Sequence, residues 1–136
     1  MTKTNYYVVL DYCNGGDLSD YIDANDFKNH KRVGECVARS IIKQICQGLK
    51  GIFDKGYVHR DIKLPNILLH FKDSRNPSLK DATVKIGDLG FARPITKEQW
   101  AVSQVGTPLT MAPEVILKGK KYNQQVDVWA IGVISF

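Results

Sequence analysis

A single amphipathic helix constrains this chain more than any other feature of its sequence. Between Gly34 and Phe53, apolar residues recur at a spacing of three or four. The members of this stripe are Val37, Ile41, Ile45, Leu49 and Ile52. That spacing places them on one face of a helix, and such a face is stable only when it is buried. Lys55 and Gly56 follow, and a cation with glycine just beyond it is a common helix end.

Two elements are expected before this helix. Tyr6–Leu10 is aromatic and β-branched, which predicts a buried strand. Asp17 is expected to cap a short helix that reaches Ile22. The polar residues 23–31 predict a loop.

Short strands are expected after the long helix. They lie at residues 57–58, 67–69 and 83–86. The polar residues 71–82 join the last two strands and predict an extended hairpin loop. Residues 87–113 show no periodicity, and a long irregular stretch in a compact domain is usually functional. The apolar run 126–136 predicts the start of a buried helix.

Length and composition exclude several classes of protein. A chain of 136 residues with 43% apolar and 24% charged residues is typical of one soluble domain or part of one. A disordered tail, a collagen-like repeat and a disulfide-dense toxin are excluded. The net charge of +5 is scattered, which favours a solvated surface over a nucleic-acid footprint. A basic nucleic-acid-binding module therefore has only the net charge in its favour.

The cysteines and the apolar runs indicate where the protein works. Three cysteines without a CxxC pair indicate reduced thiols, as in a cytosolic or nuclear protein, and we expect a cytoplasmic one. No run approaches the ~18 apolar residues of a membrane span. The first apolar stretch is also too short for a secretory signal.

The segment His59–Asn66 concentrates polar chemistry in one loop. Asp61, Lys63 and Asn66 place a carboxylate, an ammonium and an amide within six residues. Such a set can hold a hydroxyl, a phosphate and a divalent cation together. By itself it could also be an ordinary polar turn. Three further motifs follow in order: Asp88-Leu89-Gly90, Ala112-Pro113-Glu114 and Asp127-Val128-Trp129.

This ordered set resembles the eukaryotic protein kinases. The resemblance covers residues 1–136 as a partial kinase domain, with a hinge at 8–16, a catalytic loop at 59–66, and a metal-binding loop and activation segment at 88–114. It implies an α+β, protein-kinase-like fold. Most of it would be the helical large lobe with small β-hairpins, with the N-terminal lobe almost absent.

The resemblance also implies residue roles. Asp61 would orient the substrate hydroxyl and accept its proton, and Lys63 would neutralise the transferring phosphoryl group. Asn66 and Asp88 would hold the two Mg²⁺ ions that bridge the phosphates of ATP. Lys63 and the run Gly106-Thr107-Pro108 are similar to the serine/threonine type. Thr107 would then help to seat the acceptor hydroxyl of a protein substrate near Asp61.

The opening segment resembles a hinge that binds adenine. Leu10 takes the place of the gatekeeper, and the backbone of Asp11 and Cys13 would pair with the base. Asp17 would reach the ribose, and Leu68 would form the floor under the base. Two plainer interpretations stay open, since Asp17 can simply cap a helix and Cys13 can be a small buried thiol.

Arg60 suggests regulation, because kinases with this residue often need a phosphate on the activation segment. Ser103 is the best-placed candidate, and Thr96, Thr107 and Thr110 are others. An unmodified polar loop residue is the alternative for Ser103.

Closer similarity points to one subfamily. The runs 12–18, 90–93 and 111–116 resemble the autophagy-initiating serine/threonine kinases. Two departures from the kinase pattern stand out. Leu89 replaces a phenylalanine and is expected to pack as an apolar plug. Pro65 comes one residue late, which is expected to make Leu64 extended and to re-aim the loop slightly.

The chain holds no glycine-rich loop, no strand lysine and no partner helix glutamate. We therefore expect the parent protein to be an active kinase and the isolated chain to be inactive. The alternative is a truncated, non-catalytic product that acts as a binding decoy.

Overall fold

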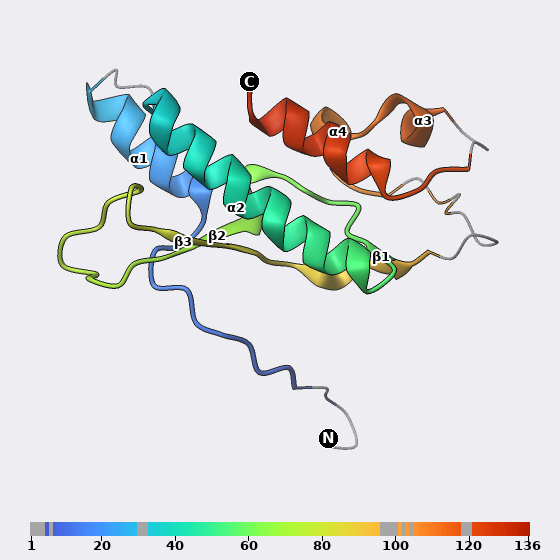
Figure 1. Ribbon diagram of the computed structural model, residues 1–136, viewed down its shortest axis with the longest axis horizontal. Coiled ribbons are helices and arrows are strands. Elements are labelled where there is room, and N and C mark those ends of the chain that lie inside the picture. The colour runs from blue at the N-terminus through green and yellow to red at the C-terminus, as the bar shows by residue number, and fades with distance from the viewer. Residues whose placement is uncertain are drawn as a thin grey trace.

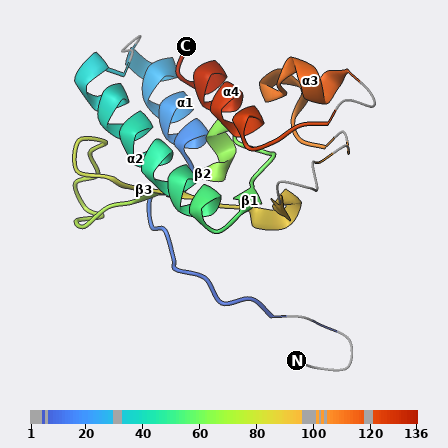
Figure 2. The same ribbon diagram turned by 45° about the vertical axis from the view of Figure 1, so that its right-hand side comes forward.

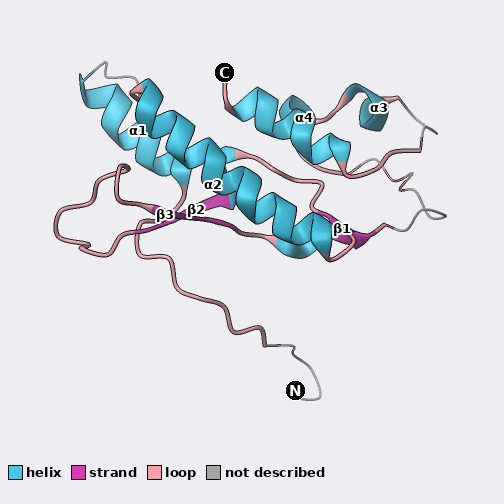
Figure 3. Ribbon diagram, in the orientation of Figure 1, coloured by secondary structure: helices cyan, strands magenta, loops and turns pink. Residues whose placement is uncertain are grey.

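The computed structural model describes residues 5, 7–29, 33–95, 101, 103, 105–117 and 121–136. Within them the fold is α+β, with four α-helices and two small two-stranded sheets. Helices and loops make up most of the described chain, and the strands are short (Figure 3).

The long helix α2 (Glu35–Asp54) confirms the prediction from the apolar stripe. Its residues Ile41, Ile45 and Leu49 are buried. Gly34 caps its beginning, and Gly56 follows its end with φ of 75°, a conformation that glycine adopts without strain. Periodicity alone was sufficient here, because the whole apolar face enters one core.

Helix α1 (Leu18–Asn29) begins where predicted but is longer than expected. The backbone N–H of Asp20 donates to Oδ1 of Asp17 at 2.9 Å, so Asp17 does cap this helix. The loop predicted from residue 23 is wrong as far as Asn29. No glycine or proline interrupts α1, so its polar residues extend the helix instead of ending it.

Two antiparallel pairs of strands carry the loops. Strand β2 (Ile67–His70) pairs with β3 (Thr83–Ile86), with Ile67 opposite Ile86, and confirms the predicted hairpin. Strand β1 (Tyr57–Val58) pairs with β4 (Arg93–Pro94). Strand β4 was not predicted, since two residues are too few to show a period.

The predicted buried strand at residues 6–10 is wrong. Tyr6 lies outside the described residues, and residues 7–10 form no strand and are 72 to 95% exposed. Their apolar pattern suits a strand, but a strand forms only when a neighbour pairs with it. In the described part of the chain no segment does so, and the segment leads away from the body (Figure 2).

The segment joins the body at Asn14. The side-chain amide of Asn14 donates to the carbonyl of Phe71 at 2.8 Å and accepts from its N–H at 2.7 Å. Gly15 then donates to Leu69 at 2.9 Å. A Cβ on Gly15 would lie 2.4 Å from the ring of Phe71, so glycine is required at this approach.

Two apolar clusters hold these elements together. The larger one joins α1, α2, the β2–β3 hairpin and α4 (Gln125–Ile134), and α2 runs through the middle of the molecule (Figure 1). The smaller one joins β1, α3 (Pro113–Ile116) and the residues before α4. Helix α4 buries Val126, Asp127, Ala130 and Ile131. Its other face exposes Val128, Trp129 and Val133, so the expected buried helix is buried on one side only. None of the helices in the described ranges is long and apolar enough to cross a membrane.

Candidate active site

Asp61 lies at the centre of the loop between β1 and β2. Its side chain is almost fully buried. Oδ1 of Asp61 accepts a hydrogen bond from the hydroxyl of Thr107 at 2.7 Å, and Oδ2 lies 2.9 Å from Nζ of Lys63. Nζ of Lys63 also donates to the Thr107 hydroxyl at 3.0 Å. These contacts close a triangle between two segments that are 44 to 46 residues apart.

The neighbours of Asp61 set its protonation state. Burial disfavours the charged form of the carboxyl. Hydrogen bonds from Lys63 and Thr107, together with the charge of Lys63, outweigh burial and hold the pKa of Asp61 below its ordinary value of 3.8. The carboxylate is therefore ionised at neutral pH. Lys63 and Thr107, which contact it, are the two groups beside it that can face a substrate.

Asn66 braces the same carboxylate. Its amide nitrogen donates to the carbonyl of Asp61 at 2.8 Å and to Oδ2 at 3.1 Å. The segment Leu64–Asn66 forms a tight 3₁₀ turn, so the expectation of an extended Leu64 is wrong. Pro65 is accommodated at the beginning of this turn, where it has no N–H to lose, and Asn66 still reaches Asp61.

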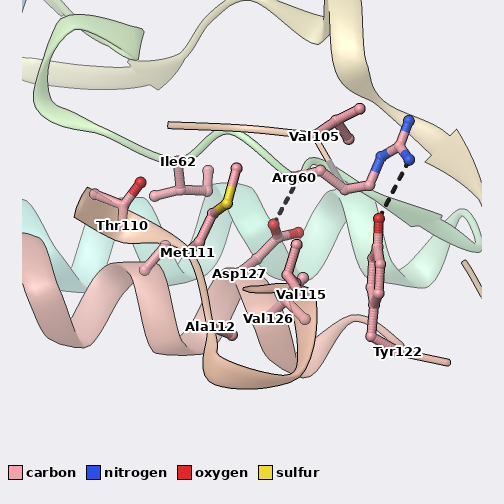
Figure 4. Close-up of a pocket in the computed structure, with 11 residues that line it drawn as sticks. Arg60, Ile62, Val105, Thr110, Met111, Ala112, Val115, Tyr122, Val126 and Asp127 are labelled. Atoms are coloured by element: carbon pink, nitrogen blue, oxygen red, sulfur yellow. Dashed lines mark hydrogen bonds between the residues drawn. The ribbon is translucent and has the colours of Figure 1, made fainter. Parts of the chain in front are cut away.

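The backbone of the loop is held from α4. Arg60 has a left-handed φ of 72°, which is unusual for a residue with a side chain. The carboxylate of Asp127 accepts the backbone N–H of His59 at 2.7 Å and that of Arg60 at 2.8 Å (Figure 4). Burial raises the pKa of Asp127, and the two N–H donors act against that rise. The ring of His59 also lies 2.9 Å from the carbonyl of Gly87, which ties this loop to the end of β3.

The hairpin places Asn66 close to the segment of Asp88. Asn66 precedes β2, and Gly87 follows β3 and donates to the carbonyl of Asn66 at 2.8 Å. Asp88 is exposed, with φ of 52°, and its Oδ1 accepts from the N–H of Gly90 at 3.1 Å. The amide nitrogen of Asn66 is committed to Asp61, so its oxygen is the atom that faces other ligands.

The amide oxygen of Asn66 and the carboxylate of Asp88 are suitable ligands for a hard cation such as Mg²⁺. This ion prefers carboxylate and amide oxygens and keeps several waters. Within the described ranges no group of three or more His, Cys, Asp or Glu side chains gathers, so an all-protein metal cage is not formed there. Leu89 next to Asp88 is 58% exposed, so the expectation that it packs as a plug is not met.

Two of the residues expected to bind adenine and ribose, Asp17 and Leu68, meet at the β2–β3 hairpin. Asp17 forms a backbone bridge with Leu68, and a Cβ on Gly87 would lie 2.9 Å from the Leu68 side chain. The carboxylate of Asp17 caps α1, which is the plainer of its two interpretations. Cys13 is a half-buried free thiol.

Leu10 and Asp11 are both exposed and lie before Asn14 in the chain. Asp11 pairs with Nζ of Lys85 on β3 at 2.5 Å, and the hydrogen bond and charge of Lys85 lower the pKa of this exposed carboxyl. This ion pair was not anticipated from the sequence.

The guanidinium of Arg60 reaches the activation segment. Its Nε donates to the carbonyl of Phe91 at 2.7 Å, and its Nη1 donates to the hydroxyl of Ser103 at 2.7 Å. The structure thus brings together the two residues proposed from sequence for regulation. Thr96, another candidate, lies outside the described residues.

Three residues shape the site through contacts that sequence reasoning did not predict, and one of them, Tyr122, was not singled out at all. Asp127 was named in the motif 127–129 but given no contact, although a carboxylate in an apolar run is a signal that buried N–H groups need an acceptor. Gly106 has φ of 117° and lies against the carbonyl of Arg60. Tyr122 donates its hydroxyl hydrogen to the carbonyl of Ser103 at 2.6 Å, and no pattern in the sequence indicates this contact.

Comparison with known proteins assigns this arrangement to a class. Residues 1–136 match the family model described as the protein kinase domain. The chain therefore belongs to the protein kinase family.

Its curated relatives are serine/threonine-protein kinases. ATG1a of Arabidopsis thaliana is 42% identical over 135 residues, which cover 99% of this chain and 20% of that protein. ULK1 of Homo sapiens is 38% identical over 130 residues, covering 96% of this chain and 12% of that protein. CLA4 of Saccharomyces cerevisiae is 39% identical over 138 residues, covering 98% and 15%. The chain thus spans 12 to 20% of the length of these relatives. The similarity to ATG1a and ULK1 agrees with the subfamily that the motifs resemble.

Proposed function

We propose that this chain is the catalytic and metal-binding part of an active serine/threonine protein kinase. The parent protein would transfer the γ-phosphoryl group of ATP to serine or threonine hydroxyls of a protein substrate. The observation that carries the proposal is the triangle of Asp61, Lys63 and Thr107, which puts an ionised carboxylate, an ammonium and a hydroxyl within 3.0 Å of one another.

Each member of the triangle has a part in this transfer. Asp61 would orient the acceptor hydroxyl and take its proton, while Lys63 would balance charge on the transferring phosphoryl group. The lowered pKa makes Asp61 a weak base, so positioning would be its larger contribution and proton uptake would come late. Thr107 would seat the acceptor by holding the other carboxylate oxygen in place.

Cofactor binding would use the hairpin and the segment before it. Asn66 and Asp88 would hold Mg²⁺, which neutralises the phosphates of ATP when it is bound. The backbone of Asp11 and Cys13 would pair with adenine, Leu68 would lie under the base, and Leu10 would be the gatekeeper beside it. Asp17 would approach the ribose in addition to capping α1.

Phosphorylation of Ser103 would regulate the site. Nη1 of Arg60 already donates to the Ser103 hydroxyl, and a phosphate there would accept a charge-assisted hydrogen bond in the same direction. Because Arg60 adjoins Asp61, added charge at Ser103 would act close to the catalytic carboxylate.

Membership of the kinase family also supports proposals about the lobe, the subfamily and the cellular compartment. The described elements would be the large lobe of a kinase domain, with little of the N-terminal lobe. The similarity to ATG1a and ULK1 supports an autophagy-initiating kinase. Reduced thiols at all three cysteines would suit a cytoplasmic protein.

The test is Asp61→Asn in the full-length protein that contains this chain. Phosphate transfer from ATP to a serine or threonine peptide should fall by ~10²–10⁴-fold, the usual contribution of a positioned base. Asp73→Asn is the matched control, because the exposed side chain of Asp73 contacts Arg75 on the loop between β2 and β3 and lies outside the proposed site. Equal activity in the two variants would refute the proposal. The 136-residue chain alone should transfer no phosphate, and measurable turnover by it would contradict the expectation that the isolated chain is inactive.

A further inference from the structure

Tyr122 fastens the activation segment to the body of the domain. It lies three residues before α4 and is 3% exposed. Its backbone forms a two-way antiparallel bridge with Ala101, with N–H to carbonyl distances of 3.0 and 3.1 Å. Ala101 is itself buried. The activation segment is therefore attached at this point through Tyr122.

The hydroxyl of Tyr122 completes a ring of hydrogen bonds. It donates to the carbonyl of Ser103 at 2.6 Å and accepts from Nη1 of Arg60 at 3.4 Å. The same Nη1 donates to the Ser103 hydroxyl at 2.7 Å. The ring thus joins the backbone and the side chain of Ser103 to one guanidinium nitrogen.

Arg60 is held at both ends by neighbouring residues of one segment. Asp127 accepts its backbone N–H, and Tyr122, five positions earlier, lies against its guanidinium (Figure 4). Arg60, Tyr122, Met111 and Val115 are among the residues that line a small cavity of about 10 Å³, with room for about one water. The guanidinium cannot move away from Ser103 without losing the contact with Tyr122.

We propose that Tyr122 is a positioning residue, whose hydroxyl holds Ser103 over Arg60 and so forms the receiving site for a phosphate before the phosphate is added. This inference rests on the proposed function and deepens its regulation. Without a phosphate, Ser103 is held over Arg60 only through neutral oxygen atoms, which are its own hydroxyl and carbonyl and the hydroxyl of Tyr122. A phosphate would put an ionised acceptor opposite the guanidinium, so both partners would be charged and the Tyr122 hydroxyl would matter less.

The competing explanation is that Tyr122 only fills space. Its ring belongs to the smaller apolar cluster with Val58, Ala112 and Val115. Phenylalanine keeps the ring and removes only the hydroxyl, so Tyr122→Phe separates the two explanations. Tyr57→Phe is the matched control, since Tyr57 is a half-exposed tyrosine on β1 that takes no part in the proposed site.

The experiment uses the full-length protein with Ser103 either dephosphorylated by a phosphatase or replaced by genetically encoded phosphoserine. In the dephosphorylated state Tyr122→Phe should lower kcat by about fivefold, the effect of one neutral hydrogen bond, and leave KM for ATP unchanged. In the phosphoserine state the loss should be below twofold, and Tyr57→Phe should change neither state. An unchanged kcat, or an equal loss in both states, would overturn the proposal.

A second readout does not depend on catalysis. Amide hydrogen exchange at Ala101 should accelerate by about fivefold in dephosphorylated Tyr122→Phe, because the bridge to residue 122 opens more often, and should stay unchanged in Tyr57→Phe. Unchanged exchange would overturn the inference. If the wild-type protein transfers no phosphate in either state, the proposed function fails, and hydrogen exchange still decides the role of Tyr122.

Discussion

Replacing Gly106 by alanine should separate Thr107 from Asp61 without removing any polar group. Gly106 has φ of 117°, and a Cβ there would lie 2.4 Å from the carbonyl oxygen of Arg60. Ordinary contacts between carbon and oxygen are about 3.3–3.6 Å, so the two backbones must move apart by about 1 Å. Asp127 holds the Arg60 side of this contact, and we expect the activation segment to be the part that moves.

Two costs follow from this geometry. A residue with a side chain at such a φ is strained by ~1–3 kcal/mol, which should appear as a loss in the free energy of unfolding of about 2 kcal/mol. A displacement of about 1 Å at a catalytic group can lower the rate by ~10²-fold. Thr107 directly follows Gly106, so its 2.7 Å contact with Asp61 should be lost.

The assay compares Gly106→Ala with Gly51→Ala in the full-length protein. Gly51 lies in α2, and a Cβ there meets no atom within 4 Å. Alanine at this helical position should stabilise the fold by up to ~1 kcal/mol and leave kcat unchanged. Urea unfolding and steady-state phosphate transfer measure the two effects. If Gly106→Ala keeps a kcat within twofold of the control, the reasoning from this close contact is wrong.

Two further substitutions test the electrostatics of the loop. Lys63→Met removes the cation that opposes the effect of burial on the Asp61 carboxyl, so the pKa of Asp61 should rise. A ¹³C titration of this carboxyl measures the change. An unmoved pKa would contradict the conclusion that Lys63 lowers it. In the wild type the ionised carboxylate stabilises the folded state above its unfolded pKa, and that contribution is lost as the pH falls through the lower folded pKa. Asp127→Asn should cost about 2–3 kcal/mol in urea unfolding, because an amide can accept only one of the N–H groups of His59 and Arg60 and leaves the other buried without an acceptor. Wild-type stability in that variant would show that these bonds do not hold the loop.

Local patterns in the sequence were sufficient for the elements that depend on local physics. The stripe in α2 has the helical period over twenty residues, and the polar segment between β2 and β3 has the composition of a turn. The candidate site residues Asp61, Lys63 and Asn66 lie within six residues of one another, so their grouping was visible without a fold. The motif order then indicated the kinase family, which the family model confirms.

Local sequence patterns failed to predict structure that depends on contacts between residues far apart in the chain. Residues 7–10 have strand-like side chains, but strand formation depends on a neighbour that the described chain does not provide. The residues after Asp23 are polar enough for a loop, yet α1 continues through them to Asn29. The contact of Asp127 with Arg60 spans 67 residues, and the contact of Tyr122 with Ser103 involves a hydroxyl that no period or spacing reveals.

The shape of the loop around Asp61 therefore depends on α4 as much as on the loop itself. Arg60 in a left-handed conformation costs ~1–3 kcal/mol, which a free loop would avoid. Two hydrogen bonds to the Asp127 carboxyl, each contributing ~1 kcal/mol, are comparable in size to that strain and oppose it. They exist only while Val126 and Ala130 keep α4 docked in the core. If α4 undocks, the strain is no longer opposed, Arg60 can relax, and the adjoining Asp61 loses its place beside Thr107. The position of Asp61 beside Thr107 thus depends on the docking of α4. Substitutions that loosen α4 should therefore lower activity before they unfold the chain.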